Sequence, residues 1–113
     1  MAKYKNIYES WKKNPIQFWK NLSKDIDWNT KPSKILDDDK TPFNRWFPEA
    51  TLNTSYNAID RHVIAGKGEQ DAIIYDSPIT NVKRKISYSE LQYQVSQFAG
   101  ALLKQDVQKG ERV

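Results

Sequence analysis

Residues 86–103 read ISYSELQYQVSQFAGALL and give the clearest helix signal in the sequence. Ser87 is suited to cap a helix, because its hydroxyl can accept a hydrogen bond from a free N–H of the first turn. Glu90 stands where its carboxylate can reach back to the N–H of the cap, as in a capping box. The apolar residues that follow return to one helix face: Leu91, Val95, Phe98, Ala99, Leu102 and Leu103. We therefore expect an amphipathic helix whose apolar face needs a covering surface.

The composition excludes several kinds of site. The 113 residues include no cysteine, so a disulfide, a thiolate nucleophile and a cysteine-ligated metal are all excluded. The single histidine, His62, rules out a histidine-rich metal site. No apolar run approaches the ~18 residues of a membrane span, and residues 1–10 resemble neither a secretory signal nor a transit peptide. We expect a soluble, cytoplasmic protein with no membrane partner.

The charge and the aromatic content raise the question of nucleic-acid binding. The net charge is +4, and the chain has four Trp, six Tyr and four Phe. The lysines are spread along the chain among 14 acidic residues, whereas a nucleic-acid surface requires a basic patch or stripe. We therefore expect no nucleic-acid partner.

Two helical segments open the chain. The first has an aromatic and apolar stripe made of Tyr4, Ile7, Tyr8 and Trp11. Pro15 interrupts it, since proline lacks an N–H and disfavours helix at the preceding residue. Asn14 can cap a second helix over residues 15–24, with Gln17 at the position of a capping-box partner. We expect the aromatic side chains of this helix to pack on a larger body rather than to form a ligand site.

Residues 27–52 show no sustained period and contain three prolines. Their apolar content argues against disorder, so we expect an extended segment, without regular structure, that holds aromatic side chains on a surface. The run at residues 37–39, three aspartates, could form a metal cluster. It lacks the alternating spacing and the glycine of a calcium loop, and we expect a solvated turn with no metal site.

A third helix is expected over residues 53–64, capped by Asn53 or Ser55. By helical counting His62 lies on its outer flank. A catalytic base needs a nucleophile or an orienting carboxylate close by, and Asp60, two residues away, falls on the wrong helix face. We expect His62 to have a structural or hydrogen-bonding role.

The third helix leads into a hairpin. Gly66-Lys67-Gly68 matches no phosphate-binding motif and predicts a helix C-cap and turn. Residues 71–75 and 81–86 predict two strands that run into the capped helix, and residues 111–113 look like the opening of a further strand. The fold class is α/β, in the form of an α+β fragment. Because a β-α-β unit needs its second strand, we expect either heavy dimerisation or a chain cut from a longer protein.

Several segments resemble the N-terminal region of AMP-forming short-chain acyl-CoA synthetases. They are residues 15–19 (PIQFW), 26–28 (IDW), 53–62 (NTSYNAIDRH), 86–91 (ISYSEL) and 109–113 (KGERV). Within that family, residues 36–38, 45–48 and 72–80 are most similar to propionyl-CoA synthetases rather than acetyl-CoA synthetases. One departure is Glu49-Ala50, which stands where we expect a glycine pair.

The resemblance implies a division of the chain. Residues 1–65 would be a helical and extended wrapping region, and residues 66–113 would begin the AMP-binding α/β domain. The parent enzyme would activate a short carboxylate, propionate or acetate, with ATP and Mg, and pass the acyl group from an acyl-adenylate to CoA. The phosphate loop, the ribose-binding carboxylate and the catalytic lysine of such an enzyme have no counterpart in this sequence. We therefore expect no catalytic, cofactor-binding or metal-binding residue in the chain.

Two functions remain open at this point. The first is a non-catalytic portion of an acyl-CoA synthetase, with the remainder of the enzyme as its intramolecular partner. The alternative is a self-standing module for protein interaction or oligomerisation, without enzymatic activity, that uses the same apolar faces.

Overall fold

The computed structural model describes residues 2–113, which form two compact units, residues 2–54 and residues 55–113. The described residues contain helices and three two-stranded antiparallel sheets, so the expected α+β class is confirmed. The two units divide at Thr54 and Ser55. The resemblance described above implies a different boundary, between residues 65 and 66, where the AMP-binding domain would begin. That boundary stays a prediction.

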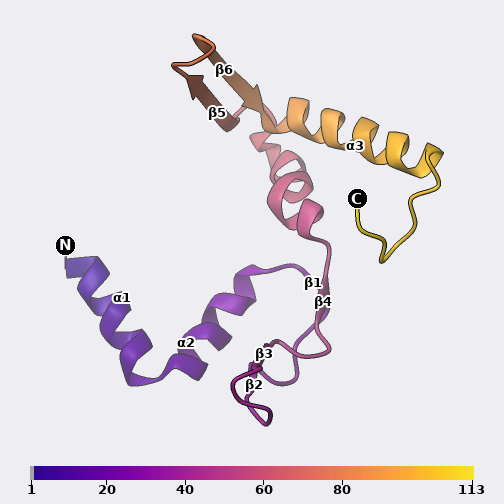
Figure 1. Cartoon of the computed structure of the whole chain (residues 1–113). Coiled ribbons are helices and arrows are strands. Elements are labelled where there is room, and N and C mark those ends of the chain that lie inside the picture. Colours follow the sequence, from indigo (N-terminus) through magenta and orange to yellow (C-terminus); the bar gives the residue numbers. More distant parts are fainter. Residues whose placement is uncertain (1) are drawn as a thin grey trace. The chain divides into compact units, whose positions relative to one another are not determined.

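Two helices open the first unit, α1 (Ala2–Lys13) and α2 (Pro15–Leu22), and they join at a sharp break (Figure 1). The cap of α2 is the expected one, because Asn14 Oδ1 accepts a hydrogen bond of 3.0 Å from the backbone N–H of Gln17. The reciprocal half of the box is not formed. The Gln17 side chain donates instead to Asn21 Oδ1, one turn along the same helix, at 3.0 Å. A 3₁₀ turn, η1 (Ser23–Asp25), follows α2.

The segment at residues 27–52 has more regular structure than expected. Strand β1 (Trp28–Thr30) pairs with β4 (Thr51–Leu52), and β2 (Leu36–Asp37) pairs with β3 (Arg45–Trp46), both antiparallel. Each ladder contains only two residue pairs. A period-2 pattern needs about four residues to be recognisable, so strands of this length leave no signal in the sequence.

The helix of the second unit runs to Lys67, three residues beyond its expected end. It contains two π-helical stretches, η2 (Tyr56–Asp60) and η3 (Val63–Lys67). The predicted turn begins within η3: Gly66 has a φ of 77°, in the left-handed region that glycine adopts without strain, and breaks the helical backbone there. At Gly68 a Cβ atom would collide with Ser89 Oγ, and the Gly68 carbonyl accepts a hydrogen bond of 2.9 Å from the Ser89 N–H. Glycine therefore permits the helix end to approach the next helix closely.

The predicted hairpin and capped helix are also confirmed. Strands β5 (Asp71–Ser77) and β6 (Val82–Ser87) pair in antiparallel fashion, and β6 runs directly into α3 (Tyr88–Lys104), as Figure 1 shows. Ser87 Oγ accepts a hydrogen bond of 3.2 Å from the Glu90 N–H. The Glu90 carboxylate, however, accepts from Arg84 at 2.5 Å and from Gln94 at 2.9 Å. A charged guanidinium is a stronger donor than a neutral amide, which explains why the expected reciprocal capping bond is replaced.

Little of this structure is buried. Among the described side chains, Ile59, at 9% exposure, is the one buried apolar residue, and Ser23 is the one buried polar residue. Helix α3 has no buried residue; Phe98 is 64% exposed and Leu103 is 70% exposed. None of the helices in residues 2–113 combines the length and the apolar character that crossing a membrane requires.

Candidate functional site

The aromatic side chains of the first unit form a connected cluster. Trp19 of α2 meets Trp46 of β3 edge to face, with ring centroids 5.7 Å apart. Phe47 joins this pair to Trp28, with centroid distances of 6.0 Å to Trp46 and 5.4 Å to Trp28. Trp19 and Trp46 remain 37% and 49% exposed. The segment at residues 27–52 therefore places its aromatic rings against α2 and against each other, while part of the cluster stays accessible.

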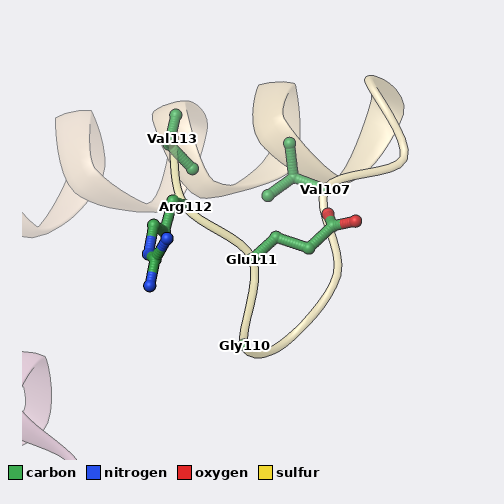
Figure 2. Close-up of a pocket in the computed structure, with 5 residues that line it drawn as sticks. All are labelled: Val107, Gly110, Glu111, Arg112 and Val113. Carbon is green, nitrogen blue, oxygen red and sulfur yellow. The ribbon is translucent and has the colours of Figure 1, made fainter.

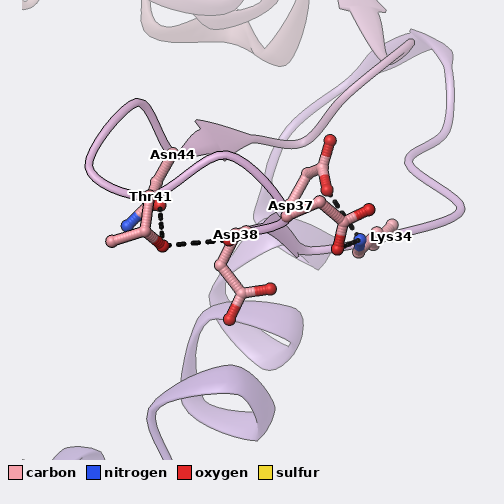
Figure 3. A network of polar contacts seen from close by, with 6 residues as sticks. Lys34, Asp37, Asp38, Thr41 and Asn44 are labelled. Carbon is pink, nitrogen blue, oxygen red and sulfur yellow. Dashed lines mark hydrogen bonds and ion pairs between the residues drawn. The ribbon is translucent and has the colours of Figure 1, made fainter.

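Lys34 pairs with two of the three aspartates at residues 37–39, as the dashed lines in Figure 3 show. Lys34 Nζ lies 2.7 Å from Asp37 Oδ1 and 3.5 Å from Asp39 Oδ1. Asp38 uses its backbone, since its carbonyl accepts a hydrogen bond of 2.9 Å from Thr41 Oγ1. The hydrogen bond to Lys34 lowers the pKa of Asp37, and the same bond raises the pKa of Lys34. Across residues 2–113, no three histidine, aspartate or glutamate side chains are grouped as metal ligands would be.

His62 does not lie on an open outer flank, and that expectation was wrong. Its ring packs against the ring of Tyr88 in α3, with centroids 4.9 Å apart. The π-helical turn η2 comes just before it, and a π-helix bonds residue i to i+5 rather than i to i+4. Counting at 3.6 residues per turn therefore misplaces the side chains that follow.

The carboxylate of Asp60 forms a hydrogen bond with α3. Its Oδ1 accepts a hydrogen bond of 2.7 Å from Gln92 Nε2 of α3. The Asp60–Gln92 bond and the His62–Tyr88 ring contact both join the helix of the second unit to α3. The contacts that the structure records for these two residues thus link one helix to the other.

The basic residues of β6 are matched one by one with carboxylates. Lys83 Nζ lies 3.0 Å from Asp76, and Lys85 Nζ lies 2.5 Å from Asp71, both on β5, while Arg84 pairs with Glu90. All these side chains are exposed or half-buried, and such surface pairs contribute little to stability. Their effect is to neutralise what would otherwise be a basic strand.

The last residues of the chain line an open hollow of about 690 Å³, shown in Figure 2. Val107 and residues 110–113 form its walls, and Val113 is 90% exposed. Glu111 Oε2 accepts a hydrogen bond of 2.6 Å from the Gln108 N–H. Residues 111–113 are irregular, so the strand expected there is not formed. A strand requires a neighbour to supply its hydrogen bonds, and no such neighbour lies beside them in the described part of the chain.

Strand β5 and helix α3 of the second unit carry large apolar side chains that are exposed. They are Ile73, Ile74, Tyr75, Tyr93, Phe98 and Leu103. Successive strand residues point to opposite faces, and helix residues five apart point about 140° from one another, so these side chains lie on more than one side of each element. We call these six residues the hairpin–helix face, as a name for the set.

Comparison with known proteins finds a family-model match over the first unit. Residues 4–58 match the family model described as "Acetyl-coenzyme A synthetase N-terminus". The residues matched cover most of α1, all of α2 and the four short strands of the first unit.

Over nearly its whole length the chain is similar to larger enzymes. It is 42% identical over 112 residues to a human protein named acyl-CoA synthetase short-chain family member 3, mitochondrial, and 44% identical to the rat protein of that name. It is 40% identical over 114 residues to an acetyl-coenzyme A synthetase of Burkholderia mallei. These alignments cover 99% or 100% of the chain but only 16% or 17% of the relatives.

The match to the family model and the alignments to the synthetases agree in what they indicate. The former covers the first unit, and the latter extend the likeness through the hairpin and α3 of the second. Residues 4–58 are similar to the N-terminus of acetyl-coenzyme A synthetases, and nearly the whole chain is similar to 16% or 17% of the length of short-chain acyl-CoA synthetases and acetyl-coenzyme A synthetases.

Proposed function

We propose that this chain is a non-catalytic N-terminal portion of an AMP-forming acyl-CoA synthetase, located in the cytoplasm. The parent enzyme would join a short acid to CoA through an acyl-adenylate, using ATP and Mg and releasing AMP and pyrophosphate. Propionate is the substrate that we propose first, because the segments at residues 36–38, 45–48 and 72–80 resemble propionyl-CoA synthetases. Acetate is the next candidate.

The observation that carries the proposal is the coverage of the alignments. The similarity extends over 99% of the chain and yet over only 16% of the human relative. A chain of that share would contain one region of a synthetase, and the phosphate loop, ribose-binding carboxylate and catalytic lysine that the resemblance implies have no counterpart in its sequence. The contacts of His62 with Tyr88 and of Asp60 with Gln92 agree with this, since both join one helix to another.

The partner that we propose is the remainder of the same synthetase. The hairpin–helix face supports this, because apolar area that is buried against a sheet contributes about 25 cal/mol per Å². In this chain that area is exposed, with Ile74 at 71% and Leu103 at 70%. Contact with the rest of the enzyme would cover the face and recover that free energy.

An activity assay tests the proposal in two arms. The protein as encoded, including any residues beyond Val113, is incubated with ATP, Mg and CoA and with acetate, propionate or butyrate, and AMP and pyrophosphate are measured. We expect AMP formation that depends on the acid, with the highest kcat/KM for propionate. Failure with every short acid would overturn the synthetase assignment, and a preference for acetate would overturn only the choice of propionate.

The second arm uses residues 1–113 alone under the same conditions. We expect no acyl-adenylate by mass spectrometry, because the chain lacks the groups that stabilise charge at the α-phosphate. Acyl-adenylate made by the isolated chain would contradict the non-catalytic role even if the full enzyme behaves as expected.

A further inference from the structure

The first unit contains a hollow that is separate from the uncovered face of the second unit. It has a volume of about 570 Å³ and lies between α2, η1 and the residues that follow them, up to Ile35. Its apolar lining comes from Ile16, Ile26, Trp28 and Ile35. Pockets for small molecules commonly measure about 300–1,000 Å³ and have mainly apolar walls. The hollow is therefore of the size and lining that a small ligand requires.

The remaining lining combines the uncharged residues Gln17, Ser23, Pro32 and Ser33 with three lysines. These are Lys20, Lys24 and Lys31, and no acidic residue lines the hollow. Lys24 Nζ donates to the neutral side chain of Asn21 at 3.3 Å. The carbonyl of Lys20 accepts from Ser23 Oγ at 2.9 Å, but the ammonium groups of Lys20 and Lys31 make no hydrogen bond or ion pair with the described part of the chain. Three lysines thus line one hollow that no carboxylate lines. On β6, by contrast, each basic side chain is paired with an acid.

The indole of Trp28 gives this hollow a fixed wall. Its Nε1–H donates a hydrogen bond of 2.7 Å to the carbonyl of Ser23, one of the two buried residues among those described. Its ring also contacts Phe47, with centroids 5.4 Å apart. A wall that is held in place before binding reduces the entropy lost when a ligand binds. A flat apolar group could pack on this surface while its charged end reaches the lysines.

We propose that this hollow binds a small organic anion, namely a carboxylate or phosphate group carried on a compact apolar body such as a ring. The apolar body contacts Trp28 and the three isoleucines, and the anionic group lies among Lys20, Lys24 and Lys31. Benzoate and phenyl phosphate share one apolar body and differ in the anionic group, so they distinguish the two sources of charge. Benzyl alcohol, which has the ring without the charge, is the neutral reference.

The test is a titration of the 113-residue chain, followed by the NMR signal of the Trp28 indole N–H at low salt. Benzoate, phenyl phosphate or both should shift this signal with saturation, and benzyl alcohol should bind at least tenfold more weakly. Added salt should weaken binding of the anion, because exposed charges are screened within about 10 Å at 0.1 M. The same titration of a longer encoded protein shows whether the hollow stays open there.

A matched pair of triple variants locates the site. Replacing Lys20, Lys24 and Lys31 with Gln should weaken anion binding at least tenfold, whereas Lys3→Gln, Lys5→Gln and Lys13→Gln in α1 should change it less than twofold. Circular dichroism confirms that both variants keep their helices; if the first triple variant loses helix, the three single variants replace it. Equal weakening by both triple variants, a Trp28 signal that does not respond in either protein, or equal binding of benzyl alcohol would overturn the proposal.

Discussion

At the scale of single residues, the turn at Phe47–Ala50 explains a departure from the family pattern. The Ala50 N–H donates a hydrogen bond of 3.1 Å to the Phe47 carbonyl, with Pro48 and Glu49 between them. Glu49 has a φ of 65°. A turn with proline second and a positive φ third is the arrangement that favours glycine in the third position. The glycine expected at residue 49 from the resemblance is thus the residue that the backbone requires.

Replacing this glutamate with glycine should stabilise the turn. Glu49→Gly removes the cost of a side chain in the left-handed region, about 1 kcal/mol, less the entropy that glycine adds to the unfolded chain. We expect slower hydrogen exchange of the Ala50 amide, by up to about fivefold. Glu69→Gly, which removes the same charge at an exposed position without a positive φ, should not slow it. Faster exchange at Ala50 in Glu49→Gly would show that the turn is not strained.

The Lys34–Asp37 ion pair contributes to the stability of the fold in a way that depends on pH. The pKa of Asp37 lies below its ordinary 3.8, so the contribution is present above that value and is lost as the pH falls through the lowered pKa. The pKa of Lys34 lies above 10.5, so the contribution is also lost as the pH rises through that raised value. Lys34→Gln should raise the Asp37 pKa toward 3.8 in an NMR titration. Lys40→Gln is the charge-matched control, and an equal rise in both variants would exclude the direct bond as the cause.

At the scale of elements, α3 shows how far the sequence predicts the structure. Its N-cap follows from Ser87 and its length from sustained apolar spacing, while the hairpin before it follows from alternating residues, and each is found. The reciprocal bond from Glu90 is not formed. The ladders β1–β4 and β2–β3 were not foreseen, because two residue pairs carry no period. The face of His62 was also misjudged, because π-helical turns break the count of 3.6 residues per turn. Local patterns predict long regular elements, and irregular ones depend on contacts that distant residues make.

The cap of α3 provides a test at this scale. Ser87→Ala removes the acceptor of the Glu90 N–H and should destabilise the first turn of the helix by about 1 kcal/mol. Hydrogen exchange of the Glu90 amide should then be roughly fivefold faster. Ser96→Ala, at an exposed position inside α3, should leave that amide unchanged, because alanine is favourable in a helix interior. An unchanged exchange rate in Ser87→Ala would mean that the capping bond does not stabilise the turn.

At the scale of the whole molecule, exposed apolar side chains are the main physical feature. One apolar residue among those described is buried, and the hairpin–helix face remains open. From the sequence we predicted only that the chain has no catalytic, cofactor-binding or metal-binding residue. The hollow for which we propose anion binding was not predicted from the sequence. Ile16 and Ile35, which both line that hollow, are brought together by the fold, and no local pattern links them.

The isolated chain should therefore unfold without a sharp transition. Exposed apolar faces cannot offset the entropy of ordering the chain, about 1–2 kcal/mol per residue for the backbone. Calorimetry should show a broad, weakly cooperative melt, and analytical ultracentrifugation should show heterogeneous association. A discrete, tight dimer with a sharp melt would instead support a self-standing oligomerisation module.

The most direct test of the central claim, that these residues pack against the rest of a synthetase, is hydrogen exchange along α3. The amides of residues 92–104 are measured in the 113-residue chain and in the longer protein as encoded. We predict exchange in the isolated chain that is at least a hundredfold faster than in the longer protein, where the hairpin–helix face is covered. Equal, strong protection of α3 in a monomeric 113-residue chain would contradict the account.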